Sequence, residues 1–194
     1  MGAEGSKMSE ADMKFLVANT DLSQQEIELE FLKYKGQFPD GKVSESALKK
    51  FFEKVYPDTN PDAFASLMFK SFDTDRNGKI NFREFLLAIN VLKNKDKPLK
   101  LLGWAFDICD ISHGGLINKK ELETVMKASY NLLGKTPEQM ADKVFNRMDK
   151  NHDGQLTREE FNAGCAADPF LLQLLTGGVA DVLAAYKERT AVVA

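Results

Sequence analysis

The sequence of 194 residues has few cysteines and no long apolar run. Its two cysteines, Cys109 and Cys165, can form at most one bridge. One bridge is too few for a disulfide framework, which favours a reducing, intracellular location. No uninterrupted apolar stretch approaches the roughly 18 residues that a membrane-spanning helix needs, so no transmembrane helix is expected. Residues 1–14 also lack the apolar segment of a secretory signal, and none is expected.

A strong excess of one charge is absent too. The chain has 26 Lys and Arg against 29 Asp and Glu, a formal net charge of −3, so we expect no nucleic-acid partner bound through a basic surface. The sequence lacks a glycine-rich phosphate loop, and neither cysteine has a basic neighbour in sequence, so no enzyme is expected. The hydrophobic content of 43% is enough for a core that folds without disulfides or structural metals.

What the sequence does contain is an internal repeat with a period of about 40 residues. A twelve-residue segment opens at Asp73, Asp110 and Asp149, with glycine sixth, an aliphatic residue eighth and glutamate twelfth. We number these segments loop 2 (residues 73–84), loop 3 (110–121) and loop 4 (149–160). A degenerate copy, loop 1 (36–47), keeps Gly41 sixth and Val43 eighth but ends at Ala47.

Apolar residues at helical spacing flank every copy, which predicts a helix on each side of each loop. Capping-box pairs at Ser23 with Glu26 and Thr136 with Gln139 mark helix starts, and Pro61 and Pro137 suit a first helical position. The predicted fold is therefore all-α, with four helix-loop-helix units in two paired lobes, short loop-to-loop β pairings and a helical C-terminal tail. The expected helices are 9–18, 24–35, 45–55, 61–72, 82–92, 98–109, 119–132, 137–148 and 158–166.

The polar stretch 93–97 before Pro98 is the expected boundary between two lobes, 1–92 and 98–166. Within the second lobe, Ile117 of loop 3 is expected to pair with Leu156 of loop 4. The tail, residues 168–194, has two apolar stretches at helical spacing. Each stretch either packs on the C-terminal lobe or covers part of an apolar groove until a target displaces it.

The loops have the chemistry of calcium sites. Ca²⁺ takes six to eight oxygen ligands, and a loop of this kind supplies them from positions 1, 3, 5, 7, 9 and 12. Loops 2 and 4 meet every requirement, and each brings three carboxylates. In loop 2 the expected ligands are Asp73, Asp75, Asn77, the carbonyl of Lys79, Asn81 through water, and Glu84; in loop 4 they are Asp149, Asn151, Asp153, the carbonyl of Gln155, Thr157 and Glu160.

Loops 3 and 1 are poorer. Loop 3 keeps Asp110, the carbonyl of Leu116 and Glu121, but Ser112 stands third and Gly114 fifth. We expect it to bind Ca²⁺ more weakly than loops 2 and 4, or to have a purely structural role. Loop 1 should bind no metal, because residues 36, 38 and 47 are Gly, Phe and Ala and offer no side-chain oxygen.

The amino terminus fits the pattern M-G-x-x-x-[ST], so Gly2 is a candidate for N-myristoylation. A four-unit calcium-binding chain with an inactive first loop and this N-terminus resembles the neuronal calcium sensor family of EF-hand proteins. Three short motifs support the resemblance: Pro39-Asp40-Gly41 in loop 1, Trp104-Ala105-Phe106 before loop 3, and Asp168-Pro169 at the start of the tail. The chain departs from the family pattern at Phe38, where cysteine is usual, and in its less complete loop 3.

The resemblance implies a cytoplasmic calcium sensor that associates peripherally with membranes through its myristoyl group. Ca²⁺ would open an apolar groove for a helix of a target protein, and the acyl chain would be either released by Ca²⁺ or exposed at all times. The first lobe is rich in large apolar residues that serve the core or such a groove: Phe31, Leu32, Phe51, Phe52, Tyr56, Phe64, Met68, Phe69, Phe72, Phe82, Phe85 and Leu86. The alternative is a calcium buffer that changes little in shape.

Overall fold

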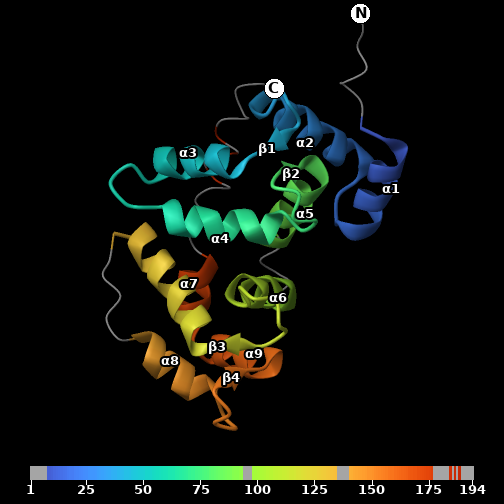
Figure 1. Ribbon diagram of the computed structural model, residues 1–194. Coiled ribbons are helices and arrows are strands. Elements are labelled where there is room, and N and C mark those ends of the chain that lie inside the picture. Colours follow the sequence, from blue (N-terminus) through green and yellow to red (C-terminus); the bar gives the residue numbers. More distant parts are fainter. Residues whose placement is uncertain are drawn as a thin grey trace, which may run out of the picture.

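The computed structural model describes residues 8–93, 98–134 and 140–176, together with residues 184, 186 and 188. Helices alternate with two-residue strands, as the repeat predicts (Figure 1). The helices are α1 Glu10–Asn19, α2 Gln24–Gln37, α3 Glu45–Val55, α4 Asp62–Phe72, α5 Phe82–Lys93, α6 Pro98–Cys109, α7 Lys119–Leu132, α8 Met140–Met148 and α9 Arg158–Ala167. The strands are β1 Lys42–Val43, β2 Ile80–Asn81, β3 Ile117–Asn118 and β4 Gln155–Leu156.

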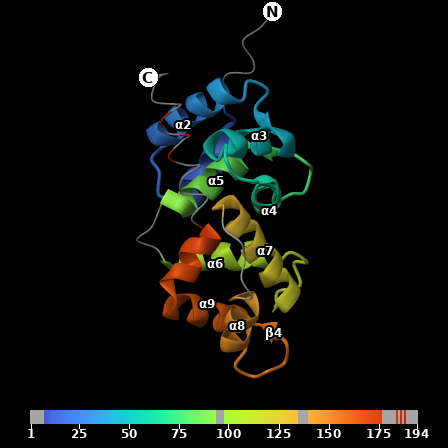
Figure 2. The same ribbon diagram turned by 90° about the vertical axis from the view of Figure 1, so that its left-hand side faces the viewer.

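The strands join the loops in pairs. β1 pairs antiparallel with β2, which places Val43 of loop 1 opposite Ile80 of loop 2. β3 pairs antiparallel with β4 and places Ile117 opposite Leu156, so the expected pairing of loops 3 and 4 is confirmed. The all-α fold of paired helix-loop-helix units is therefore the observed one, with the first pair above the second in Figures 1 and 2.

Helix boundaries agree with the prediction to within a few residues. Ser23 and Glu26 form the expected capping box, since each side chain accepts from the other residue's backbone N–H. Helix α4 begins at Asp62, one residue after the predicted start, and Pro61 stands before it as the N-cap with a near-helical backbone (φ −82°, ψ −7°). The pair Thr136 and Gln139 and Pro137 lie outside the described residues, and the predicted helix 137–148 is described from Met140 onward.

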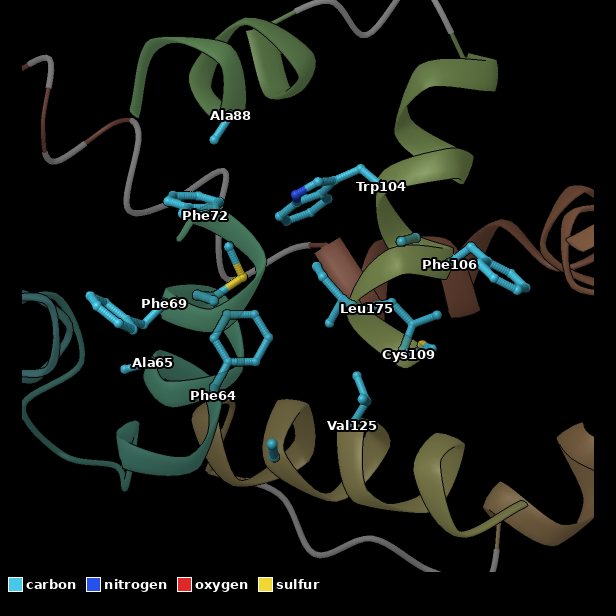
Figure 3. Packing of buried hydrophobic residues seen from close by; sticks show 14 of the residues in the cluster. Phe64, Ala65, Phe69, Phe72, Ala88, Trp104, Phe106, Cys109, Val125 and Leu175 are labelled. Carbon is cyan, nitrogen blue, oxygen red and sulfur yellow. The ribbon is translucent and has the colours of Figure 1, made fainter. Parts of the chain in front are cut away.

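The core continues from one pair of units to the other. Helix α4 contacts α6 and α7. Trp104 of α6 lies 6.3 Å, ring centroid to ring centroid, from Phe72 of α4 (Figure 3). The two cysteines are free and buried, and burial raises the pKa of the Cys165 thiol to about 12. Both are therefore unreactive core thiols.

The tail contacts both pairs of units. Residues 169–176 are helical and bury Leu171, Leu174 and Leu175. Leu175 belongs to the same cluster as Cys109 and Val125 of the second pair (Figure 3). Farther along, Tyr186 is buried and lies 5.1 Å from the ring of Phe85 in the first pair. The first stretch thus packs on the C-terminal units and the second reaches the N-terminal units.

Within the described ranges, no helix has both the length and the apolar character that crossing a membrane requires.

Candidate metal sites

Loop 2 is shaped by two residues with positive φ. Arg76 has φ 56° and Gly78 has φ 79°, a conformation in which glycine has no steric penalty. This turn points successive N–H groups toward the first residue of the loop. Asp73 accepts from the backbone N–H of Asn77 at 3.1 Å and from that of Gly78 at 2.9 Å. The backbone therefore fixes the orientation of the first carboxylate.

Three carboxylates converge in loop 2. One oxygen from each of Asp73, Asp75 and Glu84 lies within 4.8 Å of the other two. Asp73 and Glu84 are buried, with 6% and 5% of their surface exposed. Three like charges this close repel one another, and a divalent cation bound between them removes the repulsion. The donor set, which consists of oxygen atoms alone, fits Ca²⁺.

Glu84 is held in place by helix capping as well as by loop 2. Its Oε2 accepts from the Asn81 N–H, and the Asn81 side chain accepts from the Glu84 N–H, both at 3.0 Å. Its Oε1 accepts from the N–H of Thr74 at 2.9 Å. One carboxylate therefore links the start of the loop to the start of α5. The side-chain oxygen of Asn81, at position 9, is thus used by the helix cap.

The same capping arrangement recurs at the ends of loops 3 and 4. Asn118 with Glu121 and Thr157 with Glu160 form complete capping boxes at the starts of α7 and α9. The N–H and the hydroxyl of Thr157 hold the pKa of Glu160 below its ordinary value. The twelfth residue of each of these loops is thus a carboxylate that the helix cap holds in position.

Loop 4 contains a buried oxygen that lacks a partner. Asp149 Oδ2 accepts from the Gly154 N–H at 3.0 Å, while its Oδ1 is buried and has no hydrogen-bond partner in the described part of the chain. A buried acceptor in this state is costly, and a bound cation would satisfy it. Asp153 is exposed and accepts from the Asn151 amide at 2.8 Å, as Asp75 of loop 2 does from the Asn77 amide at 2.7 Å. Among the described residues, the carboxylates of loop 2 meet within 4.8 Å and those of loop 4 do not, so loop 4 presents them less closely grouped.

Loop 3 has the same frame with fewer ligands. Asp110 accepts from the N–H groups of Gly114 and Gly115, both at 2.9 Å, and Glu121 accepts from that of Ser112 at 2.8 Å. The buried carboxylates are Asp110 and Glu121 alone, so two negative charges face the site. The frame is that of a metal loop, but the charge is lower.

The carbonyl ligands expected at position 7 lie where each loop enters its strand. These residues are Lys79, Leu116 and Gln155, each directly before or at the start of β2, β3 or β4. The N–H of Lys79 donates to Asn77 Oδ1 at 2.9 Å, and that of Gln155 donates to Asp153 Oδ1 at 2.8 Å. These bonds order the fifth residue of loops 2 and 4 beside the site. Gly2 lies outside the described residues.

Loop 1 uses its third residue for packing. The ring of Phe38 lies 5.2 Å from that of Tyr34 and 6.3 Å from that of Phe85. Lys35 Nζ donates to the Pro39 carbonyl at 2.8 Å, so an ammonium group of the chain itself lies at this loop. Side-chain oxygens that could hold a metal are replaced here by an aromatic ring and a cation.

Phe38 belongs to a group of rings that we call the aromatic cluster. It joins α2, loop 1, α5 and the tail, with ring centroids 4.9 to 6.3 Å apart. The sequence indicated Phe31, Phe82 and Phe85, and it placed Tyr186 in the apolar stretch of the tail that could cover a groove, but it missed Tyr34 and Phe38. The spacing of Tyr34, three residues after Phe31 on one helix, is the signal that could have added it. The members are Phe31, Tyr34, Phe38, Phe82, Phe85 and Tyr186.

Comparison with known proteins agrees with these loops. The model of the EF-hand domain pair matches residues 100–166, and that of the EF hand domain matches residues 65–92. Neuronal calcium sensor 1 from Lymnaea stagnalis is 34% identical over 185 residues, covering 91% of this chain and 96% of the relative. Recoverin from Homo sapiens is 28% identical over 179 residues, covering 87% and 89%. The chain therefore belongs to the neuronal calcium sensor family of EF-hand, calcium-binding proteins.

Proposed function

We propose that this protein is a calcium sensor that binds Ca²⁺ in loops 2 and 4, and more weakly in loop 3, and then exposes apolar surface to a membrane-associated target. The observation that carries the proposal is the position of Glu84. It closes loop 2, and it stands in the first turn of α5 between Phe82 and Phe85 of the aromatic cluster. A ligand of the metal and the rings of a buried surface therefore share one helical turn.

The proposed ligands follow from the loop geometry. In each loop the residues at positions 1, 3 and 5 give side-chain oxygens where they have them, position 7 gives a carbonyl, and the terminal glutamate binds through both oxygens. Loop 1 binds none. The proposed ligands of loop 2 are Asp73, Asp75, Asn77, Lys79 and Glu84. Those of loop 3 are Asp110, Ser112, Leu116 and Glu121, and those of loop 4 are Asp149, Asn151, Asp153, Gln155 and Glu160.

Ca²⁺ would act on the aromatic cluster through the start of α5. The Glu84 carboxylate accepts from the backbone N–H groups of Thr74, Asp75 and Asn81. An ion bound by both of its oxygens would compete for these hydrogen bonds and draw the carboxylate closer to Asp73 and Asp75. The first turn of α5 follows, and Phe82 and Phe85 move with it. This movement is the difference between a sensor and a buffer.

The surface that opens would receive an apolar face of a target helix, the usual way in which opened calcium sensors bind. In the structure, Tyr186 of the tail covers Phe85. We infer that the tail occupies part of the target surface until the target displaces it. The role is one of binding, and we assign no catalytic residues.

Myristoylated Gly2 would supply the membrane contact. One acyl chain gives only marginal, reversible attachment, so a second contribution is needed. Two Ca²⁺ ions add four positive charges to a chain of formal net charge −3, which favours approach to an anionic membrane surface. Calcium loading and lipid attachment would thus act in the same direction.

A dye titration tests the sensor function. A hydrophobic fluorescent dye added to the full chain should brighten as Ca²⁺ fills the loops, and Glu84→Gln should remove most of that response. Mg²⁺ at the same concentration is the control, because it suits a bidentate glutamate poorly. Normal Ca²⁺ binding without dye response would make the protein a buffer and contradict the proposal.

Co-sedimentation with liposomes tests the membrane contact. Myristoylated protein should pellet with vesicles that contain anionic lipid, and Gly2→Ala should stay in the supernatant. Binding that is lost on addition of EGTA supports release of the acyl chain by Ca²⁺. Binding that ignores EGTA supports constant exposure, and equal binding of Gly2→Ala would exclude the lipid anchor.

A further inference from the structure

Tyr34 of α2 joins the two parts of the proposed sensor. Its side chain is fully buried, and its hydroxyl donates to the carbonyl of Ile80 at 2.9 Å. The Gly41 carbonyl lies 3.3 Å from the same hydroxyl. Ile80 is the eighth residue of loop 2 and Gly41 the sixth of loop 1. A single hydroxyl thus contacts the backbone of both paired loops.

The ring of Tyr34 lies at the centre of the aromatic cluster. It is 5.2 Å from Phe38, 5.4 Å from Phe82 and 4.9 Å from Phe85, centroid to centroid. Phe85 in turn lies 5.1 Å from Tyr186. A chain of direct contacts therefore runs from the Ile80 carbonyl of loop 2, through Tyr34 and Phe85, to the tail.

The hydroxyl of Tyr34 remains a neutral donor under ordinary conditions. Burial, and secondarily the negative charge of Glu84, raise the pKa of Tyr34 well above its usual range. It can therefore donate the hydrogen bond to the Ile80 carbonyl near neutral pH.

We propose that Tyr34 is a positioning residue that couples the occupancy of loop 2 to the release of Tyr186 from the aromatic cluster. When Glu84 binds the ion with both oxygens, loop 2 and the start of α5 shift together. Because its hydroxyl is bound to Ile80, the Tyr34 ring moves with loop 2. The contact between the rings of Phe85 and Tyr186 is then lost. The inference rests on the proposed sensor function and adds the route by which loop 2 reaches the tail.

Coupling of this kind is reciprocal, which makes it measurable from the calcium side. If Ca²⁺ in loop 2 expels Tyr186, then removing the Tyr186 ring must strengthen Ca²⁺ binding in loop 2. The factor should be roughly fivefold or more, the lower end of allosteric couplings. Without the Tyr34 hydroxyl, the same removal should change the affinity by less than about twofold, because the link is cut.

The experiment is a double-mutant cycle in the full-length chain: wild type, Tyr186→Ala, Tyr34→Phe and the double variant. Ca²⁺ is titrated while the amide resonance of Gly78 reports loop 2 and that of Gly154 reports loop 4. Tyr130→Phe replaces Tyr34→Phe as the matched control, since Tyr130 lies on α7 and its hydroxyl contacts the Met140 sulfur at 3.1 Å. The control should leave the effect of Tyr186→Ala on loop 2 intact.

An equal effect of Tyr186→Ala with and without the Tyr34 hydroxyl would overturn the inference. So would an effect that appears equally at Gly154. Phe85→Leu is a second test, because it keeps the Tyr34 hydroxyl but removes the ring that joins Tyr34 to Tyr186. In this background, too, Tyr186→Ala should leave the Ca²⁺ affinity of loop 2 nearly unchanged. If Tyr186→Ala leaves the Ca²⁺ affinity of loop 2 unchanged in every background while the dye still responds to Ca²⁺, the inference fails and the sensor function stands. If the dye does not respond to Ca²⁺, the sensor function itself fails.

Discussion

Loops 1 and 2 share a backbone and differ in chemistry. They pair through β1 and β2, and each has glycine with positive φ at its sixth position, Gly41 at 69° and Gly78 at 79°. In loop 2 the third residue is a carboxylate near two others, whereas in loop 1 it is Phe38, packed on Tyr34 and Phe85. The same backbone frame therefore accommodates two different sets of side chains. In loop 2 they group carboxylate oxygens, and in loop 1 they add a ring to the aromatic cluster.

The largest expected effect comes from removing the closing ligand of loop 2. Glu84→Gln keeps the shape of the side chain but loses its charge and one metal-binding oxygen. Ca²⁺ affinity of loop 2 should fall by more than the roughly 10- to 100-fold that loss of a supporting partner costs a metal site. Isothermal titration should show one strong site fewer. Glu28→Gln on the exposed face of α2 is the control, and an unchanged number of sites in Glu84→Gln would show that loop 2 does not bind.

The converse change tests loop 1. Phe38→Asp gives loop 1 an oxygen at its third position but removes a ring from the aromatic cluster. We expect no new Ca²⁺ site, because Gly36 and Ala47 still offer no ligand, and a loss of about 2 kcal/mol in the free energy of unfolding. Urea denaturation of the metal-free protein measures the loss. If Phe38→Asp is as stable as wild type, Phe38 does not support the fold. The free energy of unfolding of Phe38→Leu should lie between those of wild type and Phe38→Asp.

Loop 3 has fewer side-chain ligands than loop 2 and more than loop 1, and one substitution can add the ligand that it lacks at position 5. A Cβ added at Gly114 meets its nearest neighbour, Ser112 Oγ, at an ordinary contact distance of 3.5 Å. Gly114→Asp should therefore fit and supply the missing carboxylate at position 5. Affinity at loop 3 should rise by about tenfold, since ligand charge tunes such sites over orders of magnitude. Competition with a calcium chelator measures it. No gain would mean that loop 3 is limited by something other than its ligands.

The smallest expected effect tests what the two loops share. Gly41→Ala and Gly78→Ala each force alanine into a left-handed conformation, at a cost of about 1 kcal/mol in the metal-free protein. The two losses should be similar in thermal denaturation, while Gly78→Ala alone should also weaken Ca²⁺ binding. A loss at Gly78 but none at Gly41 would show that loop 1 does not need the turn that it shares with loop 2.

The sequence predicted those features of the fold that short-range sequence patterns determine. Helix boundaries, the loop frame and the pairing of Ile117 with Leu156 follow from periodicity, capping residues and fixed offsets, and the structure confirms them. The aromatic cluster was only partly predicted, because Tyr34, Phe38 and Tyr186 come together through contacts between distant segments. Leu32, expected in the core or a groove, is 61% exposed, since it lies on the outer side of α2. Local pattern does not say which apolar residues of a helix meet which neighbour.

The ligand sets of loops 2 and 4 look equivalent in sequence but differ in arrangement. Among the described residues, the three carboxylates of loop 2 meet within 4.8 Å and those of loop 4 do not, and one buried oxygen of Asp149 has no partner there. Spacing alone does not reveal such differences. The twelfth residue was the most predictable part, because helix capping fixes it in each of loops 2 to 4.

Hydrogen–deuterium exchange with and without Ca²⁺ tests the central claim most directly, because it follows the loops and the tail in one measurement. We predict that Ca²⁺ slows exchange in loops 2 and 4 and speeds exchange in the tail around Tyr186. Slower exchange in the loops together with an unchanged tail would contradict the sensor account and describe a calcium buffer.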